Sequence, residues 1–192
     1  MKTTRSTLTG LLVGSLLYEK YFNINTNYSY EKILFPIAAV ESSLNPTASN
    51  GSFTGLFQFG RAAAQQTGHY KKTDPVSSSI AFVKFTLDNS DQIGGFNPKS
   101  AVQVYLIHQQ GAGGFRSLWN RVQSTPNKTI TESVLLNNRL DSGIKTYREF
   151  WDSWDARLHE VNAKSIGKGL DSPDVKEILE TLYKKNIQSI LK

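Results

Sequence analysis

Apolar residues recur along most of this chain at the three- and four-residue spacing of an α-helix. A helix over residues 34–44 would gather on one face Leu34, Ile37, Ala38, Glu41 and Leu44. Proline is tolerated only in the first turn of a helix, so Pro36 sets the predicted start between residues 32 and 35. The predicted stop is Asn45-Pro46, directly after this apolar face.

Periodicity, composition and capping signals predict further helices over residues 61–68, 75–86, 100–109, 129–140, 144–161 and 172–192. The helix at 129–140 would open with a capping box, Thr129 to Glu132. The three tryptophans, Trp119, Trp151 and Trp154, are either core residues or rings that stack on sugars. Between the first two helices, Asn50-Gly51 is a turn signal and residues 52–59 alternate like a short strand, which predicts a hairpin. The fold class is therefore mainly α, formally α+β, with one small β-hairpin.

The chain length and composition predict one main domain. With 192 residues, of which 39% are hydrophobic, the chain can bury a single core. We expect the domain over residues 1–163, with 1–29 as an N-terminal extension, and a Gly-, Lys- and Ser-rich linker over 164–171. Residues 172–192 form a capped amphipathic helix, which we expect to dock on another subunit or protein.

Two terminal features affect the expected location. Lys2 and Arg5 precede a short apolar stretch within residues 1–18, as in a secretory signal peptide, but no A-x-A cleavage site follows. We therefore favour a helix packed on the domain. A membrane-spanning helix needs about 20 predominantly apolar residues, and no segment of the sequence is long enough, so no transmembrane segment is expected.

The chain is basic, with 22 Lys+Arg against 16 Asp+Glu, a formal charge of +6 and a pI of about 9.4. This balance favours a polyanionic partner. Nucleic acid is not favoured, because the sequence has no arginine-rich run, zinc-ligand spacing or aromatic RNA-binding motif. The absence of cysteine excludes disulfides, zinc-thiolate sites and a cysteine nucleophile.

Glu41 is the candidate catalytic residue, because it lies on the apolar face of its helix. A buried carboxylate has a raised pKa, which is what a general acid working near neutral pH needs. The alternative is a glutamate at a frayed helix end that reaches water or pairs with an arginine. In the following hairpin, Gly55 allows close approach of backbone or ligand, and the Gln58 amide both donates and accepts hydrogen bonds.

Three ordered blocks resemble the catalytic domain of the soluble lytic transglycosylases, which are lysozyme-like enzymes that cleave peptidoglycan. The resemblance covers about residues 35–115. The matching residues are Glu41-Ser42, Asn45-Pro46, Ala48-Ser49, Gly55-Leu56-Phe57-Gln58, Asp74-Pro75 and His108-Gln109-Gln110-Gly111-Ala112-Gly113. The family often has methionine where Phe57 stands, and usually Tyr-Asn where His108-Gln109 stands.

The resemblance implies a lysozyme-like fold with a glycan cleft, and neither a metal nor a cofactor. Glu41 would be the acid, and Ser42 would hold the substrate or the acid. The sugar-binding positions it implies are Gly55, Phe57, Gln58, His108, Gln109 and Gly111. His108 is either a polar contact to sugar or a satisfied core histidine. Both readings stay open on the sequence.

The expected function is cleavage of the MurNAc-GlcNAc β-1,4 bond with a 1,6-anhydro product. A hydrolase generally needs a second carboxylate, and residues 42–70 contain no Asp or Glu, although Asp88 or Asp91 could fold back over the cleft. A hydrolytic goose-type lysozyme and an inactive structural protein of a virion or secretion complex are the alternatives. The His-Gln-Gln-Gly variant resembles phage-borne members, so we expect a virion-associated enzyme acting at the bacterial cell wall, or alternatively one secreted to the periplasm. The partners would be peptidoglycan and a virion protein that contacts residues 172–192.

Overall fold

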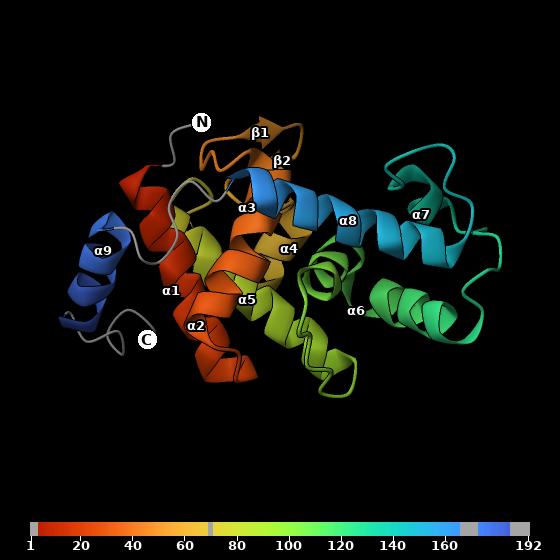
Figure 1. The fold of residues 1–192 in the computed structure, drawn as a ribbon, viewed down its shortest axis with the longest axis horizontal. Coiled ribbons are helices and arrows are strands. Elements are labelled where there is room, and N and C mark those ends of the chain that lie inside the picture. The colour runs from red at the N-terminus through yellow and green to blue at the C-terminus, as the bar shows by residue number, and fades with distance from the viewer. Residues whose placement is uncertain (1–3, 69–70, 166–172, 185–192) are drawn as a thin grey trace.

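The computed structural model describes residues 4–68, 71–165 and 173–184. The chain folds mainly into helices, with one antiparallel two-stranded sheet (Figure 1). In chain order the elements are α1 (Arg5–Phe22), α2 (Thr26–Ser29), the π-helix η1 (Tyr30–Leu34), α3 (Phe35–Ser42), β1 (Ser49–Asn50), β2 (Phe53–Thr54), α4 (Arg61–Gln66), α5 (Pro75–Gln92), α6 (Ala101–Ser124), α7 (Ser133–Asn137), α8 (Tyr147–Ser165) and α9 (Pro173–Lys184). The predicted class, mainly α with a small hairpin, is confirmed.

Helix α1 packs along α5, which confirms the expected N-terminal helix on the domain. Thr4 caps it, because its hydroxyl accepts a hydrogen bond from the Thr7 backbone N–H at 3.2 Å. At Gly10 the two helices approach so closely that an added Cβ would lie 2.4 Å from the Pro75 carbonyl oxygen. The close approach of α1 to the start of α5 therefore requires glycine at position 10.

The helix that contains Glu41 begins earlier than the proline rule predicts. The chain is helical from Thr26, and the π-helix η1 leads directly into α3. The Phe35 N–H donates to the Tyr30 carbonyl, five residues back, instead of four. Pro36 has no N–H to donate, and its ring would clash with the carbonyl of an ordinary α-helical turn before it. A π-turn is wider and so leaves room for the ring. The predicted start at residues 32–35 therefore marks a change of helix type within a continuous helical path.

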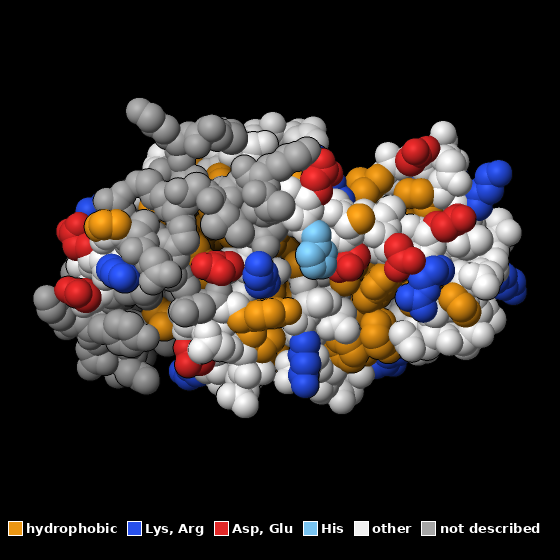
Figure 2. Space-filling view, in the orientation of Figure 1, with side chains coloured by type: hydrophobic (Ala, Val, Ile, Leu, Met, Phe, Trp, Pro, Cys, Tyr) orange, Lys and Arg blue, Asp and Glu red, His pale blue; other side chains and the backbone are white. Residues whose placement is uncertain are grey.

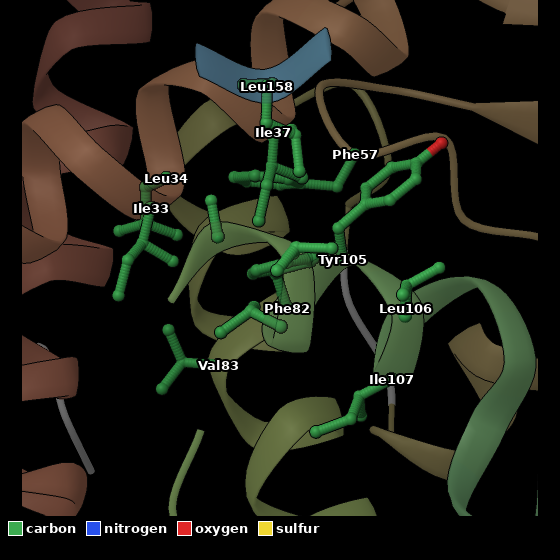
Figure 3. Packing of buried hydrophobic residues seen from close by; sticks show 14 of the residues in the cluster. Ile33, Leu34, Ile37, Phe57, Phe82, Val83, Tyr105, Leu106, Ile107 and Leu158 are labelled. Carbon is green, nitrogen blue, oxygen red and sulfur yellow. The ribbon is translucent and has the colours of Figure 1, made fainter. Parts of the chain in front are cut away.

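The core gathers side chains from α3, α5, α6 and α8 around the short loop after the hairpin (Figure 3). Ile37 on α3 and Phe57 in the loop are fully buried, and the Phe57 ring stacks on Phe82 of α5 at 4.2 Å between centroids. Leu158 of α8 closes the same cluster. This packing fixes α3 and the hairpin loop relative to α6.

Helix α6 is longer than predicted. We expected it to end at the glycines after Gln109, but it continues to Ser124 across a break at Gly111, where φ is 65° and ψ is 179°. The Asn89 side chain accepts a hydrogen bond from the Ala112 N–H at 2.7 Å and so caps the second half of the helix. The helix restarts because Phe115, Leu118 and Val122 form a buried stripe beyond the break.

The predicted helix at 129–140 is reduced to α7. Thr129 pairs with Thr146 in an isolated β-bridge and does not cap a helix. Glu132 accepts a hydrogen bond from the Tyr147 hydroxyl at 2.7 Å and pairs with Arg121 at 3.0 Å. The prediction of a capping box was wrong, because these distant partners engage the glutamate instead.

The C-terminal helix α9 lies beside α1 of the same chain (Figure 1). Ile178 is 3% exposed, and Glu177 pairs with Arg5 at 2.8 Å. We expected this helix to dock on another protein and not on the domain. That expectation is corrected for α9, which packs beside α1 and buries Ile178 within the same chain. The predicted linker at 164–171 starts inside α8, which ends at Ser165, and its remaining residues lie outside the described ones.

Charges of both signs are intermingled on the face of the molecule shown in Figure 2, and they do not form one continuous basic surface there. Across the described ranges, no helix is long and apolar enough to cross a membrane.

Candidate active site

A cleft of about 690 Å³ opens between the hairpin, α4 and α6. Its lining residues are Glu41, Asn50, Ser52, Phe53, Gln58, Gly60, Arg61, Ala62, Ala63, Tyr105, His108, Gln109 and Asn138. Four of the predicted site residues, Glu41, Gln58, His108 and Gln109, therefore lie together although up to 68 positions separate them in the sequence. A cleft of this size is within the range of ordinary ligand-binding sites.

Glu41 stands at the C-terminal end of α3, where the chain leaves the helix through Ser43 and Leu44 in the left-handed region, at φ of 53° and 63°. Its side chain is 17% exposed. Burial raises the pKa of Glu41 to about 7, and a hydrogen bond with the Tyr105 side chain acts in the opposite direction. The carboxyl group is therefore available as an acid near neutral pH, as the sequence predicted.

Tyr105 is a site residue beside Glu41 that sequence reasoning missed. It lies on α6 one turn before His108, packs its ring against Trp154 at 4.6 Å, and interacts with Glu41 through its hydroxyl. Figure 3 shows that hydroxyl pointing away from the apolar cluster. Burial and the nearby Glu41 raise the pKa of Tyr105, so it stays a neutral phenol. The available signal was its position three residues before His108, on the same helix face.

His108 is buried in the core and also lines the cleft, and its predicted contact with sugar stays a prediction. Its ring packs among Phe59, Phe82 and Phe85, with centroid distances of 5.1, 5.1 and 5.9 Å, and its side chain is 8% exposed. Its Nε2 nevertheless reaches the cleft, 4.0 Å from Oε1 of Glu41. Burial lowers the pKa of His108 to about 4, with the Phe57 backbone acting in the opposite direction. His108 is thus a neutral, buried ring at the cleft floor.

Gln58 holds the hairpin loop as well as lining the cleft. Its Nε2 donates to the carbonyls of Ala48 at 3.1 Å and Gly55 at 2.8 Å. Both amide N–H donors are therefore used within the protein, while its Oε1 has no hydrogen bond to the described residues. The group left for a ligand is an acceptor, which suits a sugar hydroxyl or amide N–H.

Four predicted site residues do not line the cleft. The Ser42 hydroxyl donates to the Ala38 carbonyl at 2.9 Å, within its own helix. Phe57 is fully buried, and Gly111 supplies the break in α6. Gly55 has φ of 92°, and an added Cβ would lie 2.0 Å from the Lys72 carbonyl oxygen, so chain packing requires this glycine. In the structure these four residues hold the backbone or the core around the cleft, so their predicted contacts with sugar, and for Ser42 with the substrate or the acid, stay predictions.

Glu41 is the single carboxylate among the described residues that line the cleft. Asp74 accepts from the Ser77 N–H at 2.7 Å and caps α5, while Asp88 and Asp91 lie on α5 outside the lining. Metal-ligating side chains do not gather in groups of three or more within the parts of the chain that the structure describes. The arrangement is one acid, one phenol and one neutral imidazole in a cleft of mixed polar and apolar lining.

Comparison with protein-family models, with curated proteins and with solved structures gave no match to this chain.

Proposed function

We propose that this protein is a peptidoglycan lytic transglycosylase that cleaves the MurNAc-GlcNAc β-1,4 bond. The observation that supports this most directly is Glu41, a buried acid with a pKa of about 7 and no second carboxylate beside it among the described lining residues. The resemblance of residues 35–115 to that enzyme family supports the same reaction, and a lysozyme-like fold is part of the proposal.

In the first step the protonated Glu41 donates its proton to the glycosidic oxygen, and the bond from that oxygen to the anomeric carbon breaks. Developing positive charge on the sugar is compensated by the Glu41 carboxylate that the transfer creates. The Tyr105 hydroxyl bonds to the ionised Glu41, since this interaction lowers the pKa of the acid. The chain thus supplies a donor that favours the state of Glu41 after proton transfer.

In the second step the muramyl 6-hydroxyl attacks the anomeric carbon and passes its proton to Glu41. One C–O bond forms for the one that broke, and Glu41 returns to its protonated state. A hydrolase would need another carboxylate about 5–5.5 Å or 6.5–9.5 Å from the acid. Because the described cleft residues offer none, the substrate's own hydroxyl is the nucleophile that this site can use.

Delivery to the cell wall in a phage particle is a separate part of the proposal and rests on the His108 to Gly111 variant of the family motif. Detection of the chain in purified particles would test it, and its detection only in the periplasm would favour secretion.

Mass spectrometry of muropeptides after digestion of purified peptidoglycan tests the reaction. We expect products with 1,6-anhydro ends from the wild type and none from Glu41→Gln. New reducing ends would show hydrolysis and contradict the proposed chemistry. No cleavage by a folded wild-type protein would favour a structural role.

A further inference from the structure

The hairpin side of the cleft carries an unassigned aromatic and cationic pair, Phe53 and Arg61. Phe53 is 51% exposed although it is a large apolar side chain, and it lines the same cleft as Glu41. An exposed aromatic ring beside hydrogen-bonding groups offers a flat face on which a sugar ring can stack. Sequence reasoning did not identify either residue.

The ring of Phe53 rests against the chain just before Arg61. A Cβ added to Gly60 would lie 3.0 Å from Cε1 of Phe53, so glycine makes room for the ring at this position. Gly60 has an extended backbone, with φ of −77° and ψ of 173°, which any residue can adopt. The space for the Phe53 ring, and not backbone strain, is therefore the reason for this glycine.

Arg61 is exposed and has no ion pair or side-chain hydrogen bond with the described residues. It is also the only described lining residue with a permanent charge, because Glu41 has a pKa of about 7 and His108 one of about 4. An arginine fork binds carboxylates through two parallel hydrogen bonds. The hairpin side therefore presents a cation and an aromatic ring, and the one carboxylate among the described lining residues, Glu41, comes from α3.

We propose that Phe53 and Arg61 form a subsite for an acidic glycan unit, in which Phe53 stacks on the sugar and Arg61 binds a carboxylate of the substituent. This inference rests on the proposed function and specifies its substrate: glycan whose stem-peptide or lactyl carboxylates are free. Asn50 and Ser52, on the same side of the cleft, supply further hydrogen-bonding groups.

The test compares native peptidoglycan with the same material after chemical conversion of its carboxylates to carboxamides. At low salt we expect Arg61→Gln to lower kcat/KM on native substrate about three- to fivefold, which is the size of an exposed ion pair. The same variant should match the wild type on amidated substrate. Lys99→Gln is the matched control, since it removes one positive charge at an exposed position outside the cleft. Added salt at about 1 M should abolish the difference.

Phe53→Ala separates the two contributions. It should lower kcat/KM on native and amidated substrate alike, because stacking does not depend on the carboxylate. Equal activity of Arg61→Gln and Lys99→Gln on native substrate would overturn the role of Arg61. Unchanged activity of Phe53→Ala on both substrates would overturn the role of Phe53.

Binding distinguishes failure of this inference from failure of the proposed function. In the Glu41→Gln background, sedimentation with insoluble peptidoglycan measures affinity without cleavage. We expect Arg61→Gln to weaken binding to native but not to amidated material, whether or not the wild type cleaves. If the wild type fails to cleave and this difference persists, the subsite stands and the transglycosylase proposal fails. If cleavage occurs and the difference is absent, the subsite fails alone.

Discussion

Replacing Glu41 by glutamine should stabilise the folded protein, and the gain should grow as the pH rises. Burial raises the pKa of Glu41 from an ordinary 4.5 to about 7, so the folded state binds its proton more tightly than the unfolded state. Between these pH values the wild type must either keep a proton that the unfolded chain has lost or bury a charge. Glutamine has nearly the same shape and no proton to lose.

The magnitude follows from the interval between the two pKa values. From 4.5 to about 7 is roughly 2.5 pH units, and each pH unit corresponds to about 1.4 kcal/mol. The contribution of the protonated Glu41 is thus fully present below pH 4.5 and is lost as the pH rises through 7. The free energy of unfolding of Glu41→Gln, minus that of the wild type, should increase by about 3 kcal/mol between pH 4 and pH 8.

Urea denaturation at closely spaced pH values measures this difference, and titrations of other groups cancel between the two proteins. Glu31→Gln is the matched control, because it removes a carboxylate on the preceding π-helix, outside the cleft. Its difference from the wild type measures the effect of removing a carboxylate elsewhere on the same helical path, and the Glu41→Gln difference is compared with it. A Glu41→Gln difference that stays constant within about 0.5 kcal/mol across this range would refute the reasoning that Glu41 is a buried acid with a raised pKa.

Three further predictions concern the cleft and its hairpin. For the wild type, kcat/KM on peptidoglycan should fall about tenfold per pH unit above pH 7, because only protonated Glu41 can donate; a pH profile that stays flat to pH 9 would contradict this. For Tyr105→Phe the alkaline limb of that profile should move to higher pH, because in the wild type the Tyr105 hydrogen bond lowers the pKa of Glu41 and the variant lacks it; an unmoved limb would show that the hydroxyl does not act on the acid. Gly55→Ala should reduce the free energy of unfolding by about 2–4 kcal/mol through its positive φ and the clash with Lys72. Gly51→Ala, which also has positive φ but open space around it, should lose only about 1 kcal/mol, and equal losses in the two variants would contradict the clash.

The position of Glu41 was predictable because local spacing determines helix faces. Ile37, Ala38 and Glu41 lie three and four residues apart, so one face must contain them all, and two of them are fully buried in the structure. The Asn50-Gly51 turn is equally local, and it joins β1 to β2 as predicted. The N-terminal helix was also visible as an apolar stretch, although its exact limits depended on the cap at Thr4.

The hydrogen bonds of the predicted polar residues were not predictable in the same way. Ser42 donates within its own helix, and Gln58 donates to two backbone carbonyls, so neither residue type by itself indicated its role. Gly111 looked like a helix stop, but Asn89 on another helix caps a second segment beyond it. In each case the partner atom is chosen by geometry and not by residue type.

The sequence by itself determined the helical class, the hairpin and the placement of one carboxylate on a buried face, because these features depend on residues within about one helical turn of each other. Only the tertiary structure decided which side chains surround that carboxylate. Tyr105 and His108 meet Glu41 from a helix more than sixty positions away, and Arg61 enters the same cleft from α4. Such contacts depend on how whole helices pack, and a residue pattern within one segment carries no record of the neighbour that will cover it.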